Sequence, residues 1–419
     1  MRKLLNIVLI LCSLYSSWTY THDDWSSISS FRIPERKIQF PNTEDFLIIV
    51  ADLHTHSVFS DGDVWPNIRV EEALKDGLDL IAVTEHLEWQ PHQIDIPHPD
   101  RNRSFLIAKK SVSSKNLMVI NGSEITRDLP TGHLNAIFIT DANKLMRIDR
   151  SKTMEAEKRV MESSETINDD EEKQVLINYA LTNMWPVEEA LKKARDQDAF
   201  VFLNHPWVEP APGEPDKIAL LTEFQQDIIN HGYVHGIEIV NGNFFSEEAF
   251  QIAIENQLTL IGTSDIHELI DWSYQPHLGG HRPVTLILSK DRTEDSIKES
   301  LFQGRTVVWY KDYLFGLKEN LEPLIKSSLK VIPHSYKEDT KVIGIEIENF
   351  SSARFLIENS SAFTLNRNSF YIEPSSKKYI EIKTIEKLEN INFSFKVLNA
   401  FFSPNESIEI DYNFSPEKN

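Results

Sequence analysis

Two histidines stand two positions apart where an apolar run ends. His54 and His56 lie in the stretch ADLHTHSVFSDG, directly after the apolar residues 46–50. Side chains alternate between the two faces of a β-strand, so residues two positions apart project from the same side. Two imidazoles held together in this way suit a metal ion better than a hydrophobic core. Asp61, in the Ser-Asp-Gly stretch that follows, is either ordinary turn chemistry or a further ligand.

The same pattern recurs where later apolar runs end. LIAVTEH ends at His86, LMVINGSEIT contains Glu124, AFVFLNHPW contains His205, and LTLIGTSDIH contains Asp265 and His267. A single histidine after a strand is more often a loop or capping residue than a ligand. Repetition at successive strand ends instead predicts one shared pocket, because the carboxyl ends of barrel strands converge on one face.

One further histidine belongs with this set. His133 opens the run HLNAIFIT nine positions after Glu124, so the loop between them can fold it back toward the same place. The only cysteine, Cys12, lies far from all of these residues. A metal here would therefore be held by nitrogen and oxygen atoms. Such ligands fit Zn²⁺, Mn²⁺ or Fe²⁺, and the sequence does not choose among them.

Short strands alternating with helices must position these residues. The candidate strands are 46–53, 79–84, 117–122, 133–140, 199–204, 236–241, 258–263 and 284–289. Helical patterns lie between them, for example at 70–74, 186–191 and 293–303. The alternation predicts an α/β protein with a mostly parallel sheet, as a barrel or barrel-like fold. The charged segment 141–184 predicts a helical surface insertion, either a partial lid or a solvated helix with no role.

The two ends of the chain differ from this central region. Residues 1–21 run from basic to apolar to small and polar, which predicts a secretory signal peptide and export to the periplasm or the cell exterior. The alternatives are an uncleaved anchor and a lipoprotein attached at Cys12. Residues 22–45 would form an N-terminal extension. Residues 325–419 contain short alternating strands and no chemical cluster, which predicts a small β-sandwich.

The overall charge limits the partners. The formal charge is −21, and removal of Arg2 and Lys3 with the signal peptide makes it −23. A strongly acidic protein is a poor partner for nucleic acid. Bound divalent cations can still make one cleft attractive to a small anion. We therefore expect a small-molecule substrate, no nucleic-acid partner and no transmembrane segment in the mature chain, with no prediction of the oligomeric state.

Five ordered motifs resemble those of the PHP (polymerase and histidinol phosphatase) superfamily of metal-dependent phosphoesterases. They are DLHTHSVFSDG, TEH, GSEIT with GHLNA, NHP, and GTSDIH. The resemblance spans about residues 46–315 and looks closest to secreted phosphodiesterase-like and CehA/McbA-type members. It implies a distorted (β/α)7 TIM-like barrel over 46–318 and two or three divalent metal ions. It also implies a phosphodiesterase that hydrolyses small organophosphates through a metal-bridging hydroxide.

The resemblance also implies a role for each matching residue. The first metal would be held by His54, His56, Glu124 and Asp265, and Glu124 would bridge to a second metal held by His133 and His205. Asp61, His86 and His267 would hold a third. Some members have histidine at the Asp61 position, so the occupancy and metal preference of the third site are less determined in this chain.

Three further residues are candidates for substrate binding or catalysis. Arg127 and Arg282 could clamp a phosphoryl group, or could be ordinary salt-bridge arginines, and His281 could assist the leaving group. A second hypothesis is a carboxylester, amide or carbamate hydrolase, which a pocket lined by Trp207 and Trp272 with few cations would favour. A third is a non-catalytic metal-dependent binding protein whose β-sandwich attaches it to a surface or glycan.

Overall fold

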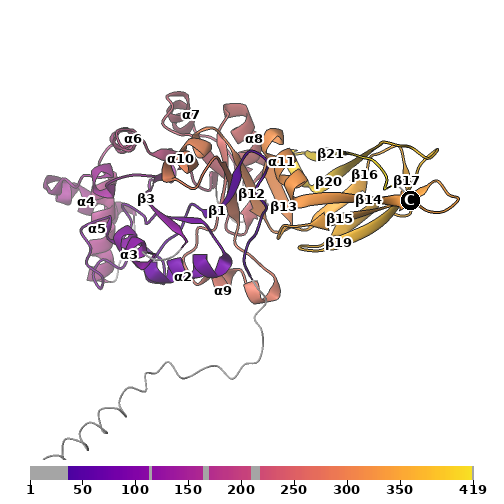
Figure 1. Cartoon of the computed structure of the whole chain (residues 1–419). Coiled ribbons are helices and arrows are strands. Elements are labelled where there is room, and N and C mark those ends of the chain that lie inside the picture. The colour runs from indigo at the N-terminus through magenta and orange to yellow at the C-terminus, as the bar shows by residue number, and fades with distance from the viewer. Residues whose placement is uncertain (1–35, 113–115, 164–168, 209–217, 418–419) are drawn as a thin grey trace, which may run out of the picture. The chain divides into compact units, whose positions relative to one another are not determined.

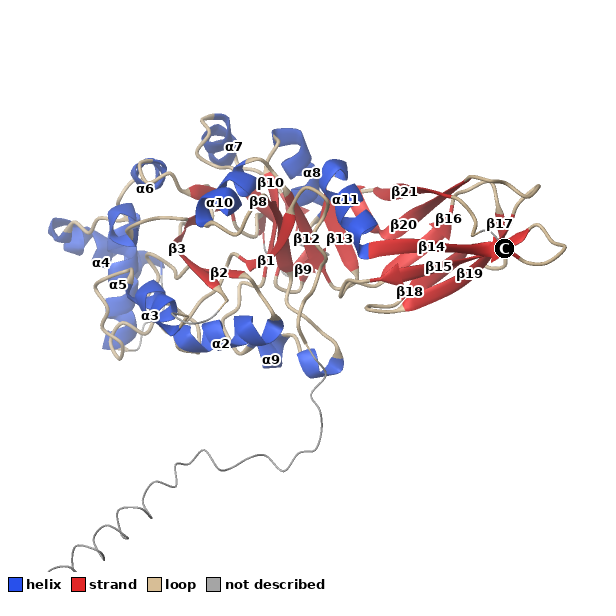
Figure 2. Cartoon of the chain, viewed as in Figure 1, coloured by secondary structure: helices blue, strands red, loops and turns tan. Residues whose placement is uncertain are grey.

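All eight strands predicted for the central region are present in the computed structural model, and they lie in one sheet (Figures 1 and 2). Nearly every residue in them is buried. The strands are β1 (Leu47–Asp52), β2 (Leu80–Val83), β3 (Met118–Ile125), β4 (Leu134–Ile137), β5 (Phe200–Leu203), β8 (Gly236–Asn241), β10 (Thr259–Thr263) and β11 (Val284–Ser289).

The structure describes residues 36–112, 116–163, 169–208 and 218–417. The predicted signal peptide, Cys12 and the first part of the predicted extension lie outside the described residues. Among the residues that are described, no helix has both the length and the apolar character needed to span a membrane.

The sheet is mixed rather than wholly parallel. Its central order is β10-β8-β5-β4-β3-β2-β1-β11, continuing through β12 (Thr306–Tyr310) and β13 (Tyr313–Gly316). Strand β4 runs antiparallel to β3 and β5, and β11 runs antiparallel to β1. The antiparallel direction of β4 puts its amino end, directly after His133, beside the carboxyl end of β3. This is the geometric reason why His133 can join residues that follow other strands.

The sheet curls so that β10 returns to β11 and β12. Gly262 of β10 donates its backbone N–H to the Thr285 hydroxyl at 3.0 Å. A Cβ at Gly262 would lie only 2.2 Å from a methyl group of Val308, so only glycine permits this approach. Beyond β10, the Asp265 N–H donates to the carbonyl of His54 at 3.0 Å. The closure is therefore barrel-like, as predicted, and it joins two of the loops that carry candidate ligands.

Helices follow most of the strands. They are α2 (Pro66–Asp76), α3 (Arg103–Ser111), α6 (Val187–Arg195), α7 (Glu223–Asn230), α8 (Glu247–Asn256), α9 (Ile270–Ser273) and α10 (Glu294–Phe302). Their starts are fixed by local chemistry: the Thr293 side chain caps α10, and Thr222 forms a capping box with Gln225 at α7. The predicted helical pattern 70–74 falls within α2, and the patterns 186–191 and 293–303 overlap α6 and α10, extending one residue beyond them at 186, 293 and 303.

The charged segment 141–184 is helical where it is described. It contains α4 (Thr153–Ser163) and α5 (Asp170–Asn183) after two short 3₁₀ turns, and residues 164–168 lie outside the described part. The two helices pack through a small core of their own that includes Ala156, Ile177 and Leu181. The prediction of a helical insertion is confirmed for the described residues.

The C-terminal region is a β-sandwich preceded by α11 (Lys318–Ser328). Its strands are β14 (Leu329–Tyr336), β15 (Val342–Asn349), β16 (Phe355–Asn359), β17 (Thr364–Leu365), β18 (Ser369–Ile372), β19 (Lys377–Lys383), β20 (Ile391–Ser403) and β21 (Glu406–Phe414). One sheet has the order β14-β15-β19-β17, and the other joins β16, β18, β20 and β21. Because α11 occupies 318–328, the sandwich begins at Leu329 rather than at residue 325.

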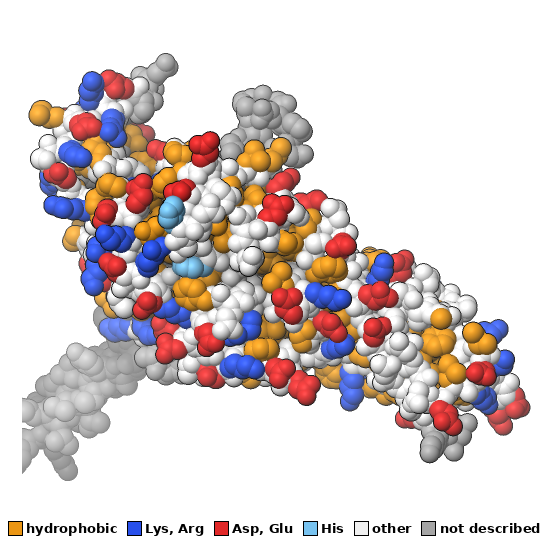
Figure 3. Space-filling view, turned by 90° about the horizontal axis from the view of Figure 1, so that it is seen from above, with side chains coloured by type: hydrophobic (Ala, Val, Ile, Leu, Met, Phe, Trp, Pro, Cys, Tyr) orange, Lys and Arg blue, Asp and Glu red, His pale blue; other side chains and the backbone are white. Residues whose placement is uncertain are grey.

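The sandwich and the barrel share a sheet and a hydrophobic core. Strand β20 pairs with β13 of the barrel sheet, and one hydrophobic core runs through both parts. On the face shown in Figure 3, acidic and basic side chains are interspersed with hydrophobic ones over both parts. An experiment on the site is therefore best done on the whole chain.

Candidate metal centre

Four predicted ligands surround one position at the carboxyl ends of β1 and β10. The Nε2 atoms of His54 and His56 lie 2.9 Å apart. Asp265 Oδ1 lies 3.1 Å from the first of these nitrogens and 3.0 Å from the second. Glu124 Oε2 lies 3.5 and 3.4 Å from the same two atoms. His54, His56 and Glu124 thus offer one set of close donor atoms that could hold a metal ion, and Asp265 adjoins both imidazole nitrogens of that set.

The other carboxylate oxygen of Glu124 faces a second group. Its Oε1 lies 3.0 Å from His133 Nδ1 and 3.6 Å from His205 Nε2. The two imidazole rings are 5.0 Å apart between centroids. Asn204 also donates to Glu124 Oε1, at 2.8 Å. Glu124 therefore lies between two sets of nitrogen donors, as a bridging carboxylate must.

The three remaining predicted ligands form a third group around Asp61. Its carboxylate lies 3.3 Å from His86 Nε2 and 3.2 Å from His267 Nε2. His56 adjoins this group, so that His56, Asp61, His86 and His267 together offer one set of close donor atoms. The nine residues predicted from the sequence thus lie in one cluster, in three overlapping groups.

The loop after Asp61 needs a glycine to hold its shape. The Gly62 N–H donates to the Ser57 carbonyl at 3.0 Å. A Cβ on Gly62 would lie 2.8 Å from the Ser57 nitrogen and 2.9 Å from the His56 carbonyl carbon. Any larger residue would displace backbone next to a candidate ligand.

Buried Arg69 of α2 fixes the loop that carries Asp265 and His267. Its guanidinium donates to the backbone carbonyls of His56, Ile266, His267 and Glu268, and it pairs with Glu72 at 2.8 Å.

The backbone is unusual at two candidate ligands. His205 has φ 27° and Asp265 has φ 47°, both in the left-handed region. Residues other than glycine adopt this region at an energetic cost, and such residues cluster at functional sites.

The local charges favour ionised carboxylates and a neutral His56. Burial raises the pKa of Glu124, but His86, His54 and His133 outweigh it and hold the pKa well below its usual range. The pKa of Asp265 is likewise held low, because His54 and His56 outweigh burial. Burial, with His267 and His86 nearby, lowers the pKa of His56 to about 3. Ionised carboxylates and a neutral imidazole are the forms that bind metal ions.

The residues present fit divalent cations. Glu124 Oε2 and Asp61 Oδ1 are buried, and their near neighbours are imidazole nitrogens: His86 Nδ1 lies 2.8 Å from the first and His267 Nε2 lies 3.2 Å from the second. A buried anionic oxygen is costly unless a donor or a positive charge lies beside it, and a cation shared with these nitrogens would supply that charge when the imidazoles are neutral. The cluster is also open on one side, because the side chains of His133, His205 and His267 are 29%, 29% and 34% exposed. Mixed histidine and carboxylate sites with an open side are typical of catalysis rather than of structural metal binding.

Neither predicted arginine reaches this open side. Arg127 is buried, pairs with Glu88 at 3.0 Å and donates to the Thr182 carbonyl of α5 at 3.1 Å. Arg282 is buried between Asp52 at 3.1 Å and Asp76 at 2.6 Å. Each guanidinium neutralises buried carboxylate charge, and this corrects the prediction that either one clamps a phosphoryl group.

His281 does not join the cluster either. Its ring stacks on Trp309 with centroids 3.6 Å apart, and its two nitrogens face the backbone carbonyls of Arg282 and Lys311. Both nitrogens are thus occupied, which corrects the predicted role in assisting a leaving group.

The two predicted tryptophans differ in position. Trp207 (β6, Trp207–Val208) lies beside His205, with ring centroids 6.4 Å apart, and it contacts the ring of Phe244 (β9, Phe244–Phe245) at 4.7 Å. Trp272 lies in α9 and is 66% exposed. Of the two, Trp207 is the one that borders the candidate ligands.

Four polar residues behind the ligands were not predicted from the sequence. Glu238 contacts His54, Asn241 contacts Asp265, and Asn204 contacts Glu124, while Glu85 binds the loop that leads to Asp61. The signal for Glu238 was available, because it is the one charged residue in the apolar strand GIEIVN. The others resemble ordinary polar residues at strand ends, and only the fold shows their partners.

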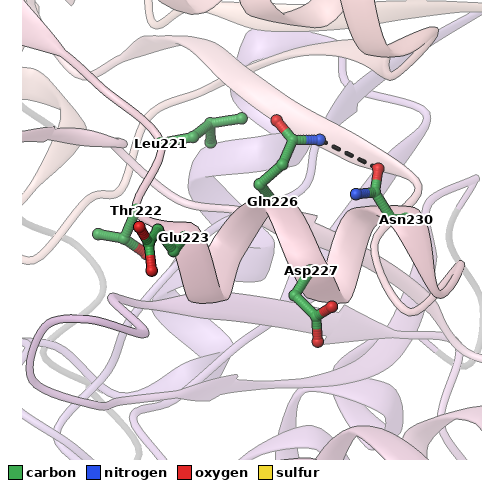
Figure 4. A pocket seen from close by; sticks show the side chains of 6 residues that line it. All are labelled: Leu221, Thr222, Glu223, Gln226, Asp227 and Asn230. Carbon is green, nitrogen blue, oxygen red and sulfur yellow. Dashed lines mark hydrogen bonds between the residues drawn. The ribbon is translucent and has the colours of Figure 1, made fainter.

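The hollow beside α7 is separate from this cluster (Figure 4). Its lining contains two acidic side chains and no histidine, lysine or arginine; the residues are Leu221, Thr222, Glu223, Gln226, Asp227 and Asn230. Gln226 and Asn230 bond to each other at 3.1 Å across it. This lining offers neither a metal site nor a cation for an anionic substrate.

One solved structure with a similar fold supports this interpretation of the site. A two-domain protein from Bacteroides vulgatus, which contains a predicted PHP-like metal-dependent phosphoesterase, is 29% identical, with a TM-score of 0.75. The match covers 92% of this chain and 100% of that one. The chain is thus similar to this PHP-like protein over nearly its whole length. The predicted resemblance to the PHP superfamily and the predicted fold class are thereby confirmed.

Two further solved structures and one family model also match the chain. A putative metal-dependent phosphoesterase from Bifidobacterium adolescentis is 18% identical, and an amidohydrolase from Chromobacterium violaceum with bound sulfate and no metal is 15% identical. Both matches cover 52% of this chain and 87% of the other, with a TM-score of 0.34, which is too low to support an argument. A family model, DUF5001, described as an Ig-like domain, matches residues 329–413, the sandwich. No curated protein matches the sequence.

Proposed function

We propose that this protein is a metal-dependent phosphoesterase, specifically an exported phosphodiesterase that hydrolyses small organic phosphate esters. The observation that carries the proposal is the cluster of six histidines and three carboxylates at one end of the barrel. The Bacteroides vulgatus relative supports it at the level of the family. The formal charge of −21 supports a small-molecule substrate rather than nucleic acid.

The assignment of residues to cations follows the three groups. His54, His56, Asp265 and Glu124 would hold the first cation, and Glu124 with His133 and His205 the second. Asp61, His86 and His267 would hold a third, and Zn²⁺, Mn²⁺ and Fe²⁺ all suit such donors. When bound, such cations supply Lewis acidity at the ester and lower the pKa of water.

The chain's own residues set the conditions for this chemistry. Glu124 stays ionised and fully buried and presents one oxygen to each neighbouring group, so it would contribute a ligand atom to each of two cations. His54 and His56 are also fully buried and close the inner side of the cluster to water. The substrate would approach over the partly exposed His133, His205 and His267. The ester would thus meet the cations on one side only.

A second candidate is a hydrolase of carboxyl esters, amides or carbamates. It is favoured by a specific observation: Arg127 and Arg282 are both committed to buried carboxylates, so neither is available to bind phosphate. Trp207, which borders His205, offers an apolar surface instead. The same metal chemistry serves both reactions, so the substrate must decide between them.

The deciding experiment compares three nitrophenyl substrates on the metal-loaded full-length protein. The substrates are bis(p-nitrophenyl) phosphate, p-nitrophenyl phosphate and p-nitrophenyl acetate. We expect the diester to have the highest kcat/KM, and Glu124→Gln to lower it by about 100-fold or more. The control, Glu189→Gln on the exposed face of α6, should match wild type. Faster turnover of acetate that is equally sensitive to Glu124→Gln would support the second candidate, and turnover insensitive to Glu124→Gln would exclude this site.

A further inference from the structure

Glu238 is a fully buried carboxylate directly behind the metal cluster. It lies in β8, between residues that form the hydrophobic core, and none of its surface is exposed. Its Oε1 accepts from Thr263 Oγ1 at 2.6 Å and lies 2.8 Å from His54 Nδ1. Its Oε2 accepts from the His205 backbone N–H at 2.7 Å and from Asn241 Nδ2 at 2.9 Å. All four acceptor positions are therefore in use, which leaves none for a cation.

These contacts reach three of the candidate ligands. Glu238 touches the ring of His54 and the backbone of His205, and Asn241 continues the network to Asp265 Oδ2 at 3.0 Å. The three ligands follow three different strands. The Glu238 side chain therefore connects, directly or through Asn241, candidate ligands as far apart in the sequence as His54 and Asp265, which are more than two hundred positions apart.

The contact with His54 also determines where its proton sits. An ionised carboxylate can only accept hydrogen bonds, so His54 Nδ1 must carry the proton. In a neutral imidazole the lone pair then belongs to Nε2, the nitrogen that faces His56, Asp265 and Glu124. A carboxylate behind a metal-binding histidine fixes its tautomer and orientation in this way.

We infer that Glu238 is the positioning residue of the first metal group, which holds His54 in the tautomer that presents Nε2 to the cation. The inference rests on the proposed metal-dependent function. It is specific to His54, because the other contacts of Glu238 are to a hydroxyl, an amide and a backbone N–H. The Nδ1 atom of His56 faces Ser60 instead, and that of His86 faces Thr126 and Glu124, which is itself a candidate ligand.

The substitution Glu238→Gln separates this role from simple support of the barrel. The backbone N–H of His205 cannot turn away, so the glutamine oxygen must face it and the NH₂ group must face His54 and Thr263. The Thr263 hydroxyl can rotate to accept a hydrogen bond, and His54 can accept only by moving its proton to Nε2. We therefore expect a folded protein in which His54 has the wrong tautomer for metal binding.

The test uses zinc alone as the probe, on the full chain. Zinc affinity is measured by competition with a chelating dye, and ¹⁵N spectra of labelled histidine, recorded at a pH at which the imidazole is neutral, report the tautomer of His54, identified by its loss in His54→Gln. We expect Glu238→Gln to bind zinc about 10-fold to 100-fold more weakly and to move the His54 proton to Nε2. Glu85→Gln removes the charge of another buried carboxylate, one bonded to Ser57 and Ser60 rather than to an imidazole, so the His54 signal should stay as in wild type.

The possible results distinguish a failure of the proposed function from a failure of the inference about Glu238. If wild type binds no zinc, the proposed function fails. If wild type binds zinc and Glu238→Gln binds it equally well with an unchanged His54 signal, the inference about Glu238 alone is overturned. Should Glu238→Gln not fold, the wild-type spectrum still decides, because a zinc-loaded protein with the proton of His54 on Nε2 contradicts the inference.

Discussion

Replacement of Arg282 by methionine should destabilise the protein while leaving the catalytic constants of the folded fraction near wild type. Arg282 is 1% exposed and pairs with Asp52 and Asp76, which come from β1 and α2. The two carboxylates raise the pKa of Arg282 although burial alone would lower it, so the guanidinium stays charged. Methionine fills a similar volume but supplies no charge.

The expected loss in free energy of unfolding depends on which hydrogen-bond and ion-pair partners Asp52 and Asp76 retain. Removal of one partner of a buried ion pair costs about 3–5 kcal/mol, because the other charge is left uncompensated. Asp76 keeps its pair with Arg36, while Asp52 keeps only the N–H and hydroxyl of Ser264. We therefore expect Arg282→Met to lower the free energy of unfolding by about 3–5 kcal/mol in total, rather than by twice that amount. Arg282→Lys keeps the charge but loses the forked geometry, so its loss should be smaller.

Urea unfolding of the full chain measures the loss, and hydrolysis by the remaining folded protein measures the catalytic effect. The control is Arg292→Met, because Arg292 is 56% exposed in its pair with Asp79 and such pairs contribute about 0–1 kcal/mol. If Arg282→Met kept wild-type stability and lost about 100-fold in kcat/KM, Arg282 would contact the substrate. The structural reasoning about its two ion pairs would then be wrong.

Three further predictions concern the cluster and its supports. Arg127→Ala should lower the melting temperature, because Glu88 loses its ion-pair partner and α5 loses a hydrogen bond to the Thr182 carbonyl. The kcat/KM of the folded protein should stay near wild type. A normal melting curve with a lowered kcat/KM would contradict this prediction. Gly62→Ala should weaken metal binding, measured by dye competition, because the added Cβ would displace backbone beside His56; unchanged affinity would show that the loop tolerates it. Burial lowers the pKa of His54, but Asp265, Glu124 and Glu238 outweigh it and raise the pKa well above 6.5. Because a cation must displace that proton, the stabilisation by added zinc should grow as the pH rises above about 6.5, and a decrease in thermal scans would contradict the sign.

Much of the barrel could be predicted because its strands are short apolar runs that end in ligand-type residues. The eight predicted central strands are found in the structure, and the nine predicted ligands lie together, since the convergence of strand ends is a property of the fold class. The antiparallel direction of β4 could not be inferred from its composition, because a short run of buried apolar residues is equally compatible with parallel and antiparallel pairing.

The arginines show where sequence reasoning ends. Arg127 follows Glu124 by three positions, which suggested a shared role, but a side chain of that length reaches Glu88 and α5 on the other side of its loop. Arg282 sits at a bend near the barrel mouth, yet its partners Asp52 and Asp76 are more than two hundred positions away in the sequence. Burial and long-range charge pairing decide such roles, and neither is visible in a local motif.

Elemental analysis combined with chelation tests the central claim most directly, because the account requires the nine-residue cluster to hold catalytic metal ions. The protein is analysed for bound transition metals before and after dialysis against a chelator, and its hydrolytic rate is measured on the same samples. We predict about two to three divalent ions per chain, loss of turnover on their removal and recovery on adding Mn²⁺ or Zn²⁺. Full turnover by a sample shown to be free of metal would contradict the account.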